Sequence, residues 1–171
     1  MPYDIQGIAI RPVREEELPL LEKLARRIWP ETYAAILTPG QIEYMIELMY
    51  ALPVIQKERH EGVTFELICS AETPIGFLAY GPYHEEPPTL KLHKLYLDSA
   101  WHGRGIGSMA LQHVIAAARL AGYRLLCLNV NKNNTAALRA YERNGFLRVD
   151  EVRISIGRGY FMDDYVMELE L

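Results

Sequence analysis

The residues of this chain best suited to chemistry form a glycine-rich stretch, His102–Ser108, with the sequence HGRGIGS. The apolar run Leu92–Leu97 before it predicts a strand, and the residues after it predict a helix from Ser108 to Ala121. A glycine turn between a strand and a helix directs several backbone N–H groups, and the positive end of the helix dipole, at one place. The sequence therefore predicts that the turn binds a phosphate or pyrophosphate group.

Two common phosphate-binding motifs do not fit this stretch. A dinucleotide fingerprint requires a third glycine where this chain has Ser108 or Ala110, and it requires an acidic residue about 20 residues further on. No Asp or Glu lies between Gly107 and Asn129. A P-loop requires Gly-Lys followed by Ser or Thr, and the sequence contains no such triplet. The stretch instead resembles Gln/Arg-x-x-Gly-x-Gly/Ala, the coenzyme A pyrophosphate loop of the GNAT-type N-acetyltransferases. His102 stands where that family usually has Gln or Arg.

A second segment, residues 134–146, resembles the same family's Asn-x-x-Ala-x-x-x-Tyr-x-x-x-Gly-Phe motif. Its residues also predict a short helix, because Asn134 can cap the first turn and Gly145 suits the positive φ at the end. Ala137 and Tyr141 are four residues apart, so they share one face of that helix. The two motifs in this order indicate the family far more specifically than either motif does alone.

The resemblance implies acetyl-CoA as co-substrate and a set of residues that bind it. The glycine turn is expected to hold the pyrophosphate, and the strand backbone before it is expected to pair with the pantetheine amides. Asn134 is expected to meet the pantetheine arm, and Arg143 the phosphate oxygens. The expected cofactor-binding residues are Leu95, Tyr96, Leu97, His102, Gly103, Arg104, Gly105, Ile106, Gly107, Ser108, Asn134, Ala137, Tyr141 and Arg143.

Two residues are candidates for proton transfer. Tyr141 matches the family's general acid, and a phenol with a pKa of about 10 suits a leaving thiol with a pKa of about 8.5 or above. Some relatives carry a Glu base early on the central strand, where the nearest match here is Lys91, which cannot serve as a carboxylate base. His93 lies two residues further along that strand and has a suitable pKa range. A structural role for His93, with a water chain to backbone carbonyls as the base, stays open.

The implied reaction is direct transfer of an acetyl group from acetyl-CoA to a primary amine in a ternary complex. The acceptor is expected to be a primary amine of a small molecule or a peptide. Three segments are loosely similar to a bacterial branch that acetylates polyamines, which makes a polyamine one candidate: Trp29–Tyr33, the helix start at Thr38, and Phe161–Met167. The competing interpretation is a non-catalytic module that binds acetyl-CoA as a sensor or docking surface. The carboxylates that could pair with ammonium groups are Glu31, Glu85, Glu86, Asp163 and Asp164.

Composition limits the class of protein. The 171 residues, half of them hydrophobic, suit one domain over residues 1–171, and a net charge of -4 argues against a nucleic-acid partner. Cys69 and Cys127 fall in apolar runs, as buried reduced thiols do, and the histidines and cysteines show no metal-ligand spacing. With no signal peptide and no apolar run long enough to cross a bilayer, we expect a cytoplasmic protein with no metal and no membrane partner. Dimerisation through the last strands is left open.

The resemblance implies a single-domain α/β GNAT fold, with a mixed central sheet of about seven strands flanked by about four helices. Hydrophobic periodicity is consistent with this order of elements. Strands are expected at Ile5–Arg11, Val63–Ala71, Ile75–Tyr83, Leu92–Leu97, Arg124–Val130, Phe146–Ile156 and Tyr160–Leu171. Helices are expected at Glu15–Trp29, where Pro30 ends the helix, and at Pro39–Ala51, Ser108–Ala121 and Asn134–Asn144, with a short helical piece from Pro53 to His60.

Overall fold

Seven strands form one mixed sheet in the computed structural model, which describes residues 5–171. The strand order is β1-β2-β3-β4-β5-β7-β6. β4 and β5 pair in parallel, whereas the other neighbouring strands pair antiparallel. The strands are β1 (Ile8–Pro12), β2 (Thr64–Ser70), β3 (Thr73–His84), β4 (Thr89–Leu97), β5 (Leu125–Asn131), β6 (Leu147–Gly157) and β7 (Tyr160–Glu170).

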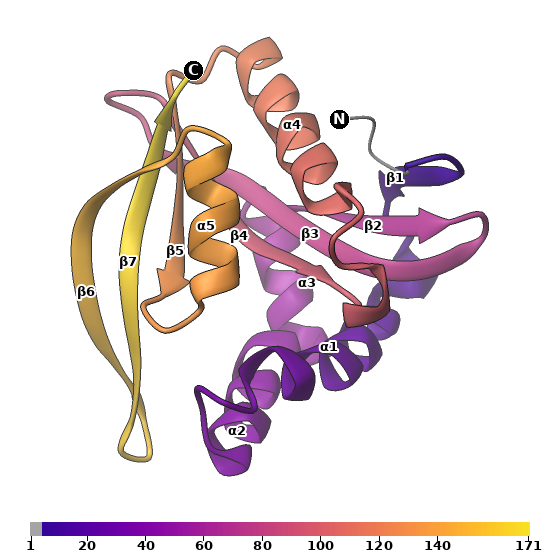
Figure 1. Ribbon diagram of the computed structural model, residues 1–171, viewed down its shortest axis with the longest axis vertical. Helices are drawn as coiled ribbons and strands as arrows, with labels where there is room; N and C mark the ends of the chain where they lie inside the picture. The colour runs from indigo at the N-terminus through magenta and orange to yellow at the C-terminus, as the bar shows by residue number, and fades with distance from the viewer. Residues whose placement is uncertain (1–4) are drawn as a thin grey trace.

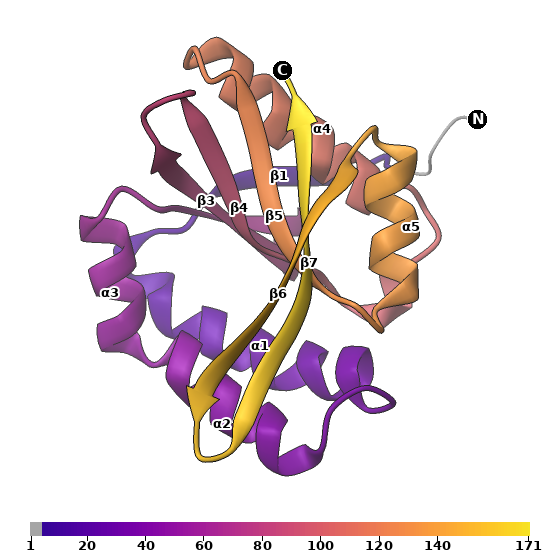
Figure 2. The same ribbon diagram turned by 90° about the vertical axis from the view of Figure 1, so that its left-hand side faces the viewer.

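Helices cover both faces of the sheet. Figure 1 and Figure 2 show α1, α2 and α3 on one side, and α4 and α5 on the other. The expected α/β class and strand number are confirmed, and the helical piece before His60 is a full helix, so five α-helices are present among the described residues. They are α1 (Leu18–Tyr33), α2 (Pro39–Tyr50), α3 (Leu52–His60), α4 (Ile106–Leu120) and α5 (Thr135–Arg143), with short 3₁₀ turns at Glu15–Glu17 and Ser99–Trp101. None of the helices in residues 5–171 is long and apolar enough to cross a membrane.

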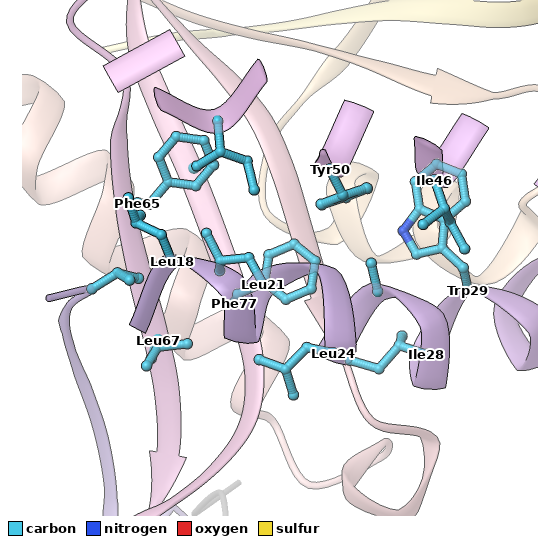
Figure 3. Packing of buried hydrophobic residues seen from close by; sticks show 14 of the residues in the cluster. Leu18, Leu21, Leu24, Ile28, Trp29, Ile46, Tyr50, Phe65, Leu67 and Phe77 are labelled. Atoms are coloured by element: carbon cyan, nitrogen blue, oxygen red, sulfur yellow. The ribbon is translucent and has the colours of Figure 1, made fainter. Parts of the chain in front are cut away.

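The core is divided by the sheet into two layers. In β3, Phe77 packs with the α1–α3 layer and Leu78 packs with the α4–α5 layer, because successive side chains point to opposite faces. Figure 3 shows the first of these layers, in which Leu21 and Leu24 of α1 pack near Leu67 and Phe77. Strands buried on both faces read as continuous apolar runs, which is why β2, β3 and β5 were recognisable in the sequence.

The prediction that Pro30 ends the first helix is wrong. α1 continues through Pro30 to Tyr33. A proline inside a helix removes one backbone hydrogen bond, but Trp29 and Tyr33 on either side of it are only 1% and 9% exposed. Their burial against the sheet outweighs the local preference, so α1 extends one turn further and brings Tyr33 within hydrogen-bond distance of Tyr96 of β4.

The central strand contains an irregularity at His93. Lys94 pairs with Ala79 of β3 and Leu92 pairs with Tyr80, so His93 is passed over in the ladder as the extra residue of a β-bulge. On the other side, the parallel pairing of β4 with β5 runs only as far as Leu92. Beyond the bulge the two strands therefore separate, and β4 presents unpaired backbone toward the gap.

Candidate active site

A cavity of about 680 Å³ lies where β4 and β5 separate. One half is lined by the end of β4, the turn before α4, β5 and α5. The other half is lined by α1, α2 and the hairpin of β6 and β7. Segments distant in the sequence therefore meet here, at the carboxyl ends of the two parallel strands, where open α/β sheets commonly bind ligands.

The glycine turn has the geometry of an anion site. Gly103 and Gly105 have φ values of +76° and +83°, and Gly105 is the N-cap of α4. The first helical bond runs from Met109 N to Gly105 O at 3.0 Å, so the preceding N–H groups of the first turn have no acceptor within the helix. A Cβ at Gly107 would meet no heavy atom within 4 Å. The packing of the fold therefore does not require glycine at 107, and the space beside it is open.

Two side chains of the turn have roles that the sequence did not reveal. His102 Nε2 donates a hydrogen bond to Leu97 O at 2.8 Å, which ties the end of β4 to the turn. The guanidinium of Arg104 lies 4.7 Å from the ring centroid of Trp101, and its Nη2 is 3.4 Å from Ala100 O. The other expected cofactor-binding residues line the cavity, whereas Arg104 lies beside it.

The helix of the second motif forms as its residues predict. Asn134 Oδ1 accepts a hydrogen bond from Ala137 N at 3.3 Å, and Gly145 after the helix has a φ of +93°. Asn144 Nδ2 donates to Ser108 Oγ at 3.2 Å, which fixes α5 against the start of α4. Tyr141 therefore faces the cavity on a helix that is capped and anchored.

Three phenols, those of Tyr33, Tyr96 and Tyr141, line the cavity. The hydroxyl oxygens of Tyr33 and Tyr96 are 2.9 Å apart, so α1 and β4 are joined at this point. Burial raises the pKa of Tyr33 to about 12 and raises the pKa values of Tyr96 and Tyr141 well above the ordinary value. All three phenols are consequently protonated at neutral pH, which suits donation of a hydrogen bond or proton rather than its abstraction.

The histidine at the bulge also lies on the cavity wall. The pKa of His93 is lowered to about 4, mainly by partial desolvation and to a smaller extent by the positive charges of Lys94 and Lys91. Lys94 is itself buried and pairs with Glu58 of α3, with Nζ 3.0 Å from Oε2. His93 is therefore neutral at pH 7 and a weak base, held beside a lysine that anchors β4 to α3.

Of the five carboxylates that the sequence suggested as partners for ammonium groups, one lies buried in the cavity wall. Asp164 lines the cavity and is only 4% exposed, and burial raises its pKa to about 6. Its neighbour Asp163 points to the other face of β7 and pairs with Lys132 at 3.1 Å. Glu31 accepts a hydrogen bond from Ser99, and the remaining two, Glu85 and Glu86, lie in the connection from β3 to β4, outside the cavity wall.

The far wall of the cavity was not visible in the sequence. Gln41 Nε2 of α2 donates to Phe161 O at 2.7 Å, and the Tyr44 hydroxyl donates to Ile156 O. These bonds hold the end of the β6–β7 hairpin against α2. Figure 2 shows this end of the hairpin beside α2. The side chains that line this half are mainly apolar: Leu37, Met45, Met49, Ile154, Phe161 and Met162. Among residues 5–171, no cluster of three or more His, Cys, Asp or Glu side chains is placed to hold a metal ion.

Known proteins resemble this chain in sequence and in fold. A sequence model described as the acetyltransferase (GNAT) family matches residues 21–146. An uncharacterised N-acetyltransferase of Mycobacterium tuberculosis is 34% identical over 82 residues, 48% of this chain and 52% of that protein. The chain thus spans about half the length of this curated relative. A spermidine N(1)-acetyltransferase of Thermoplasma acidophilum is 26% identical over 145 residues, 82% of this chain and 88% of that protein.

The fold is shared with solved structures. The crystal structure of the PaiA N-acetyltransferase from Thermoplasma acidophilum, in complex with coenzyme A, superposes with a TM-score of 0.80. The match covers 97% of this chain and 100% of that chain at 24% identity.

Proposed function

Because the chain belongs to the acetyltransferase (GNAT) family, we propose that it transfers the acetyl group of acetyl-CoA to a primary amine by direct attack in a ternary complex. The observation that carries the proposal is the meeting of three features on one cavity: the glycine turn, the bulged strand and Tyr141. The first two suit the coenzyme, and the third suits the chemistry at its thioester.

The coenzyme would lie along the half of the cavity formed by β4, α4 and α5. The N–H groups at the start of α4 would receive the pyrophosphate, since a helix N-terminus favours negative charge. The backbone of Leu95–Leu97, which has no partner in β5, would pair with the pantetheine amides. Asn134 and Arg143 lie on the cavity wall beside this path, and Arg143 is exposed there.

Two side chains are proposed for the proton transfers. Tyr141 stays protonated at neutral pH and would give its proton to the sulfur as the carbon–sulfur bond breaks. His93 stays a prediction for the base. Its pKa of about 4 makes it a weaker proton acceptor than Asp164, whose pKa burial raises to about 6.

The acceptor half of the cavity favours an amine with an apolar body. Its walls are largely methionine, leucine, isoleucine and phenylalanine side chains. Of its two carboxylates, Glu58 is paired with Lys94, which leaves Asp164 for the reacting ammonium group. The spermidine N(1)-acetyltransferase relative supports a polyamine acceptor as the second candidate. A polyamine would place further ammonium groups among apolar side chains, which is unfavourable without partners.

The test is thiol release from acetyl-CoA in the presence of hexylamine, spermidine or a short peptide with a free N-terminus, with the product identified by mass spectrometry. We expect acetyl-hexylamine, formed with a higher kcat/KM than acetyl-spermidine. A preference for spermidine would favour the polyamine acceptor and leave acetyl transfer standing. Tight binding of acetyl-CoA with no acetylated product from any amine would favour a non-catalytic binding module. A cytoplasmic location is part of the proposal, supported by the two buried free cysteines.

A further inference from the structure

Asp164 is a buried carboxylate without a structural partner of opposite charge. It lies in β7 opposite Asn131 of β5 and Val152 of β6. The ion pairs formed within residues 5–171 do not include it, although it is only 4% exposed. An ionised carboxylate this buried is unfavourable unless a cation approaches it. The charges of Lys91 and Lys132 act on Asp164, but neither lysine forms an ion pair with it. Asp164 lines the cavity, which is therefore the side from which a ligand cation would reach it.

Asp164 interacts electrostatically with ionisable groups from several elements around the cavity. Its negative charge contributes to the raised pKa of Tyr33, and Tyr33 in turn contributes to the raised pKa of Tyr141. Asp164, Tyr33 and Tyr141 all line the cavity, so the carboxylate shares it with the proposed proton donor. The titratable and polar groups that act on Asp164 come from four elements and a turn: Tyr33 of α1, Lys91 of β4, Asn129 of β5, Asp163 of β7, and Lys132 after β5.

Its basicity exceeds that of the histidine on the same cavity. Burial raises the pKa of Asp164 to about 6; the charge of Asp163 adds to this effect, whereas Asn129 and the charges of Lys91 and Lys132 oppose it. Desolvation and the charges of Lys94 and Lys91 lower the pKa of His93 to about 4. The Asp164 carboxylate is thus a stronger proton acceptor than His93. It is also negatively charged when ionised and therefore attracts a cation, whereas His93 is neutral or positive.

We infer that Asp164 binds the ammonium group of the acceptor and takes its proton, an inference that rests on the proposed acetyl transfer. The carboxylate accepts one proton from R–NH₃⁺, which leaves R–NH₂ and a neutral carboxyl group. The nitrogen lone pair then forms the bond to the acetyl carbon, and the sulfur leaves with the electrons of the carbon–sulfur bond. Tyr141 gives the sulfur a proton and regains the one that the nitrogen loses, so the products are an amide and a thiol. Asp164 returns its proton to solvent.

The experiment compares Asp164→Asn with Asp163→Asn, the adjacent residue on the opposite face of β7. Wild type and both variants are assayed with acetyl-CoA and hexylamine from pH 6.5 to 10.5. For Asp164→Asn we expect kcat/KM to fall ~100-fold at pH 7. The deficit should shrink toward pH 10.5, because an amine with a pKa of about 10 deprotonates without help there. Asp163→Asn should stay within ~2-fold of wild type, and the calorimetric affinity of both variants for acetyl-CoA should be unchanged.

A second measurement does not depend on turnover. Calorimetry with coenzyme A present, and no acetyl group to transfer, gives the affinity for hexylammonium at pH 7. We expect the affinity for hexylammonium to fall at least ~10-fold in Asp164→Asn, because this variant loses one charge-assisted hydrogen bond. The affinity should be unchanged in Asp163→Asn. Equal affinity in wild type and Asp164→Asn, or a wild-type pH profile in that variant, would overturn the role of Asp164. A wild-type protein that binds hexylammonium through Asp164 but releases no thiol would refute the proposed function instead.

Discussion

His102 Nε2 donates a hydrogen bond to the carbonyl oxygen of Leu97 across 2.8 Å, which joins the last residue of β4 to the first residue of the glycine turn. The bond fixes the strand that would pair with pantetheine relative to the turn that would hold the pyrophosphate. The imidazole thus positions the strand and the turn through the backbone, and we expect a side chain with an N–H donor of similar reach to replace it.

This relationship predicts the effects of two substitutions at position 102. His102→Gln should keep acetyl-CoA affinity within ~2-fold, because the Gln amide can donate to the same carbonyl. His102→Ala loses one hydrogen bond of about 1 kcal/mol and should weaken binding ~5-fold. Isothermal titration calorimetry measures both. Equal affinity in the Ala and Gln variants would show that the bond does not position the turn.

Gly107 allows the ligand-binding role of the turn to be separated from its folding. A side chain at 107 has open space around it, and an Asp there lies in the first turn of α4, where negative charge is favourable. Gly107→Asp should therefore leave the melting temperature unchanged or raise it. Its charge would repel the pyrophosphate and weaken acetyl-CoA binding by more than ~10-fold.

The matched control for this variant is Gly107→Ala, which adds bulk without charge. It should weaken binding less than the Asp variant while melting at a similar temperature. Unchanged coenzyme affinity in Gly107→Asp would mean that the pyrophosphate does not sit on this turn.

Asp164 should lower the stability of the protein at neutral pH. Burial raises its pKa from 3.8 to about 6, so the folded state binds a proton more tightly than the unfolded state does. Below pH 4 the carboxyl group is neutral in both states and does not lower the free energy of unfolding. As pH rises through 6 it ionises in the folded protein, and the free energy of unfolding falls. The shift corresponds to ~3 kcal/mol at pH 7 and above.

Replacing this carboxylate removes its ionisation. Asp164→Asn should raise the free energy of unfolding in urea at pH 7 by up to ~3 kcal/mol, with a smaller difference at pH 4. Higher stability together with lower activity is the pattern expected of a functional group held in an unfavourable environment. A loss of stability at pH 7 would contradict the burial of an unpaired charge.

The sequence revealed the parts of the site that depend on local chemistry. The glycine turn and α5, which lies between Asn134 and Gly145, are fixed by φ preferences and capping within a few residues, so both were predictable. The bulge at His93 was not, because it arises from how β4 pairs with β3 and β5 at once. Pro30 misled the prediction of α1, since burial of Trp29 and Tyr33 overrides the local preference. Asp163 and Asp164 were indistinguishable until the register of β7 showed which one faces the cavity.

The phenol of Tyr141 gives the most direct test of the chemistry. Burial raises its pKa, so the hydroxyl is protonated throughout the range in which an amine reacts. The hydrogen bonds found within residues 5–171 do not include this hydroxyl, whereas the ring packs on Phe146 with centroids 5.7 Å apart. Tyr141→Phe therefore removes the proton donor and keeps the packing.

For Tyr141→Phe we expect kcat to fall ~100-fold with hexylamine, while acetyl-CoA affinity and melting temperature change little. Tyr123→Phe, on a half-buried tyrosine of the same core layer away from the cavity, is the control and should keep wild-type kcat. A thioester with a better leaving group needs less help from an acid. The Tyr141→Phe deficit should therefore shrink with an acetyl thioester of a thiol more acidic than coenzyme A. A deficit that is the same for both thioesters would show that Tyr141 positions the substrate and does not protonate the sulfur.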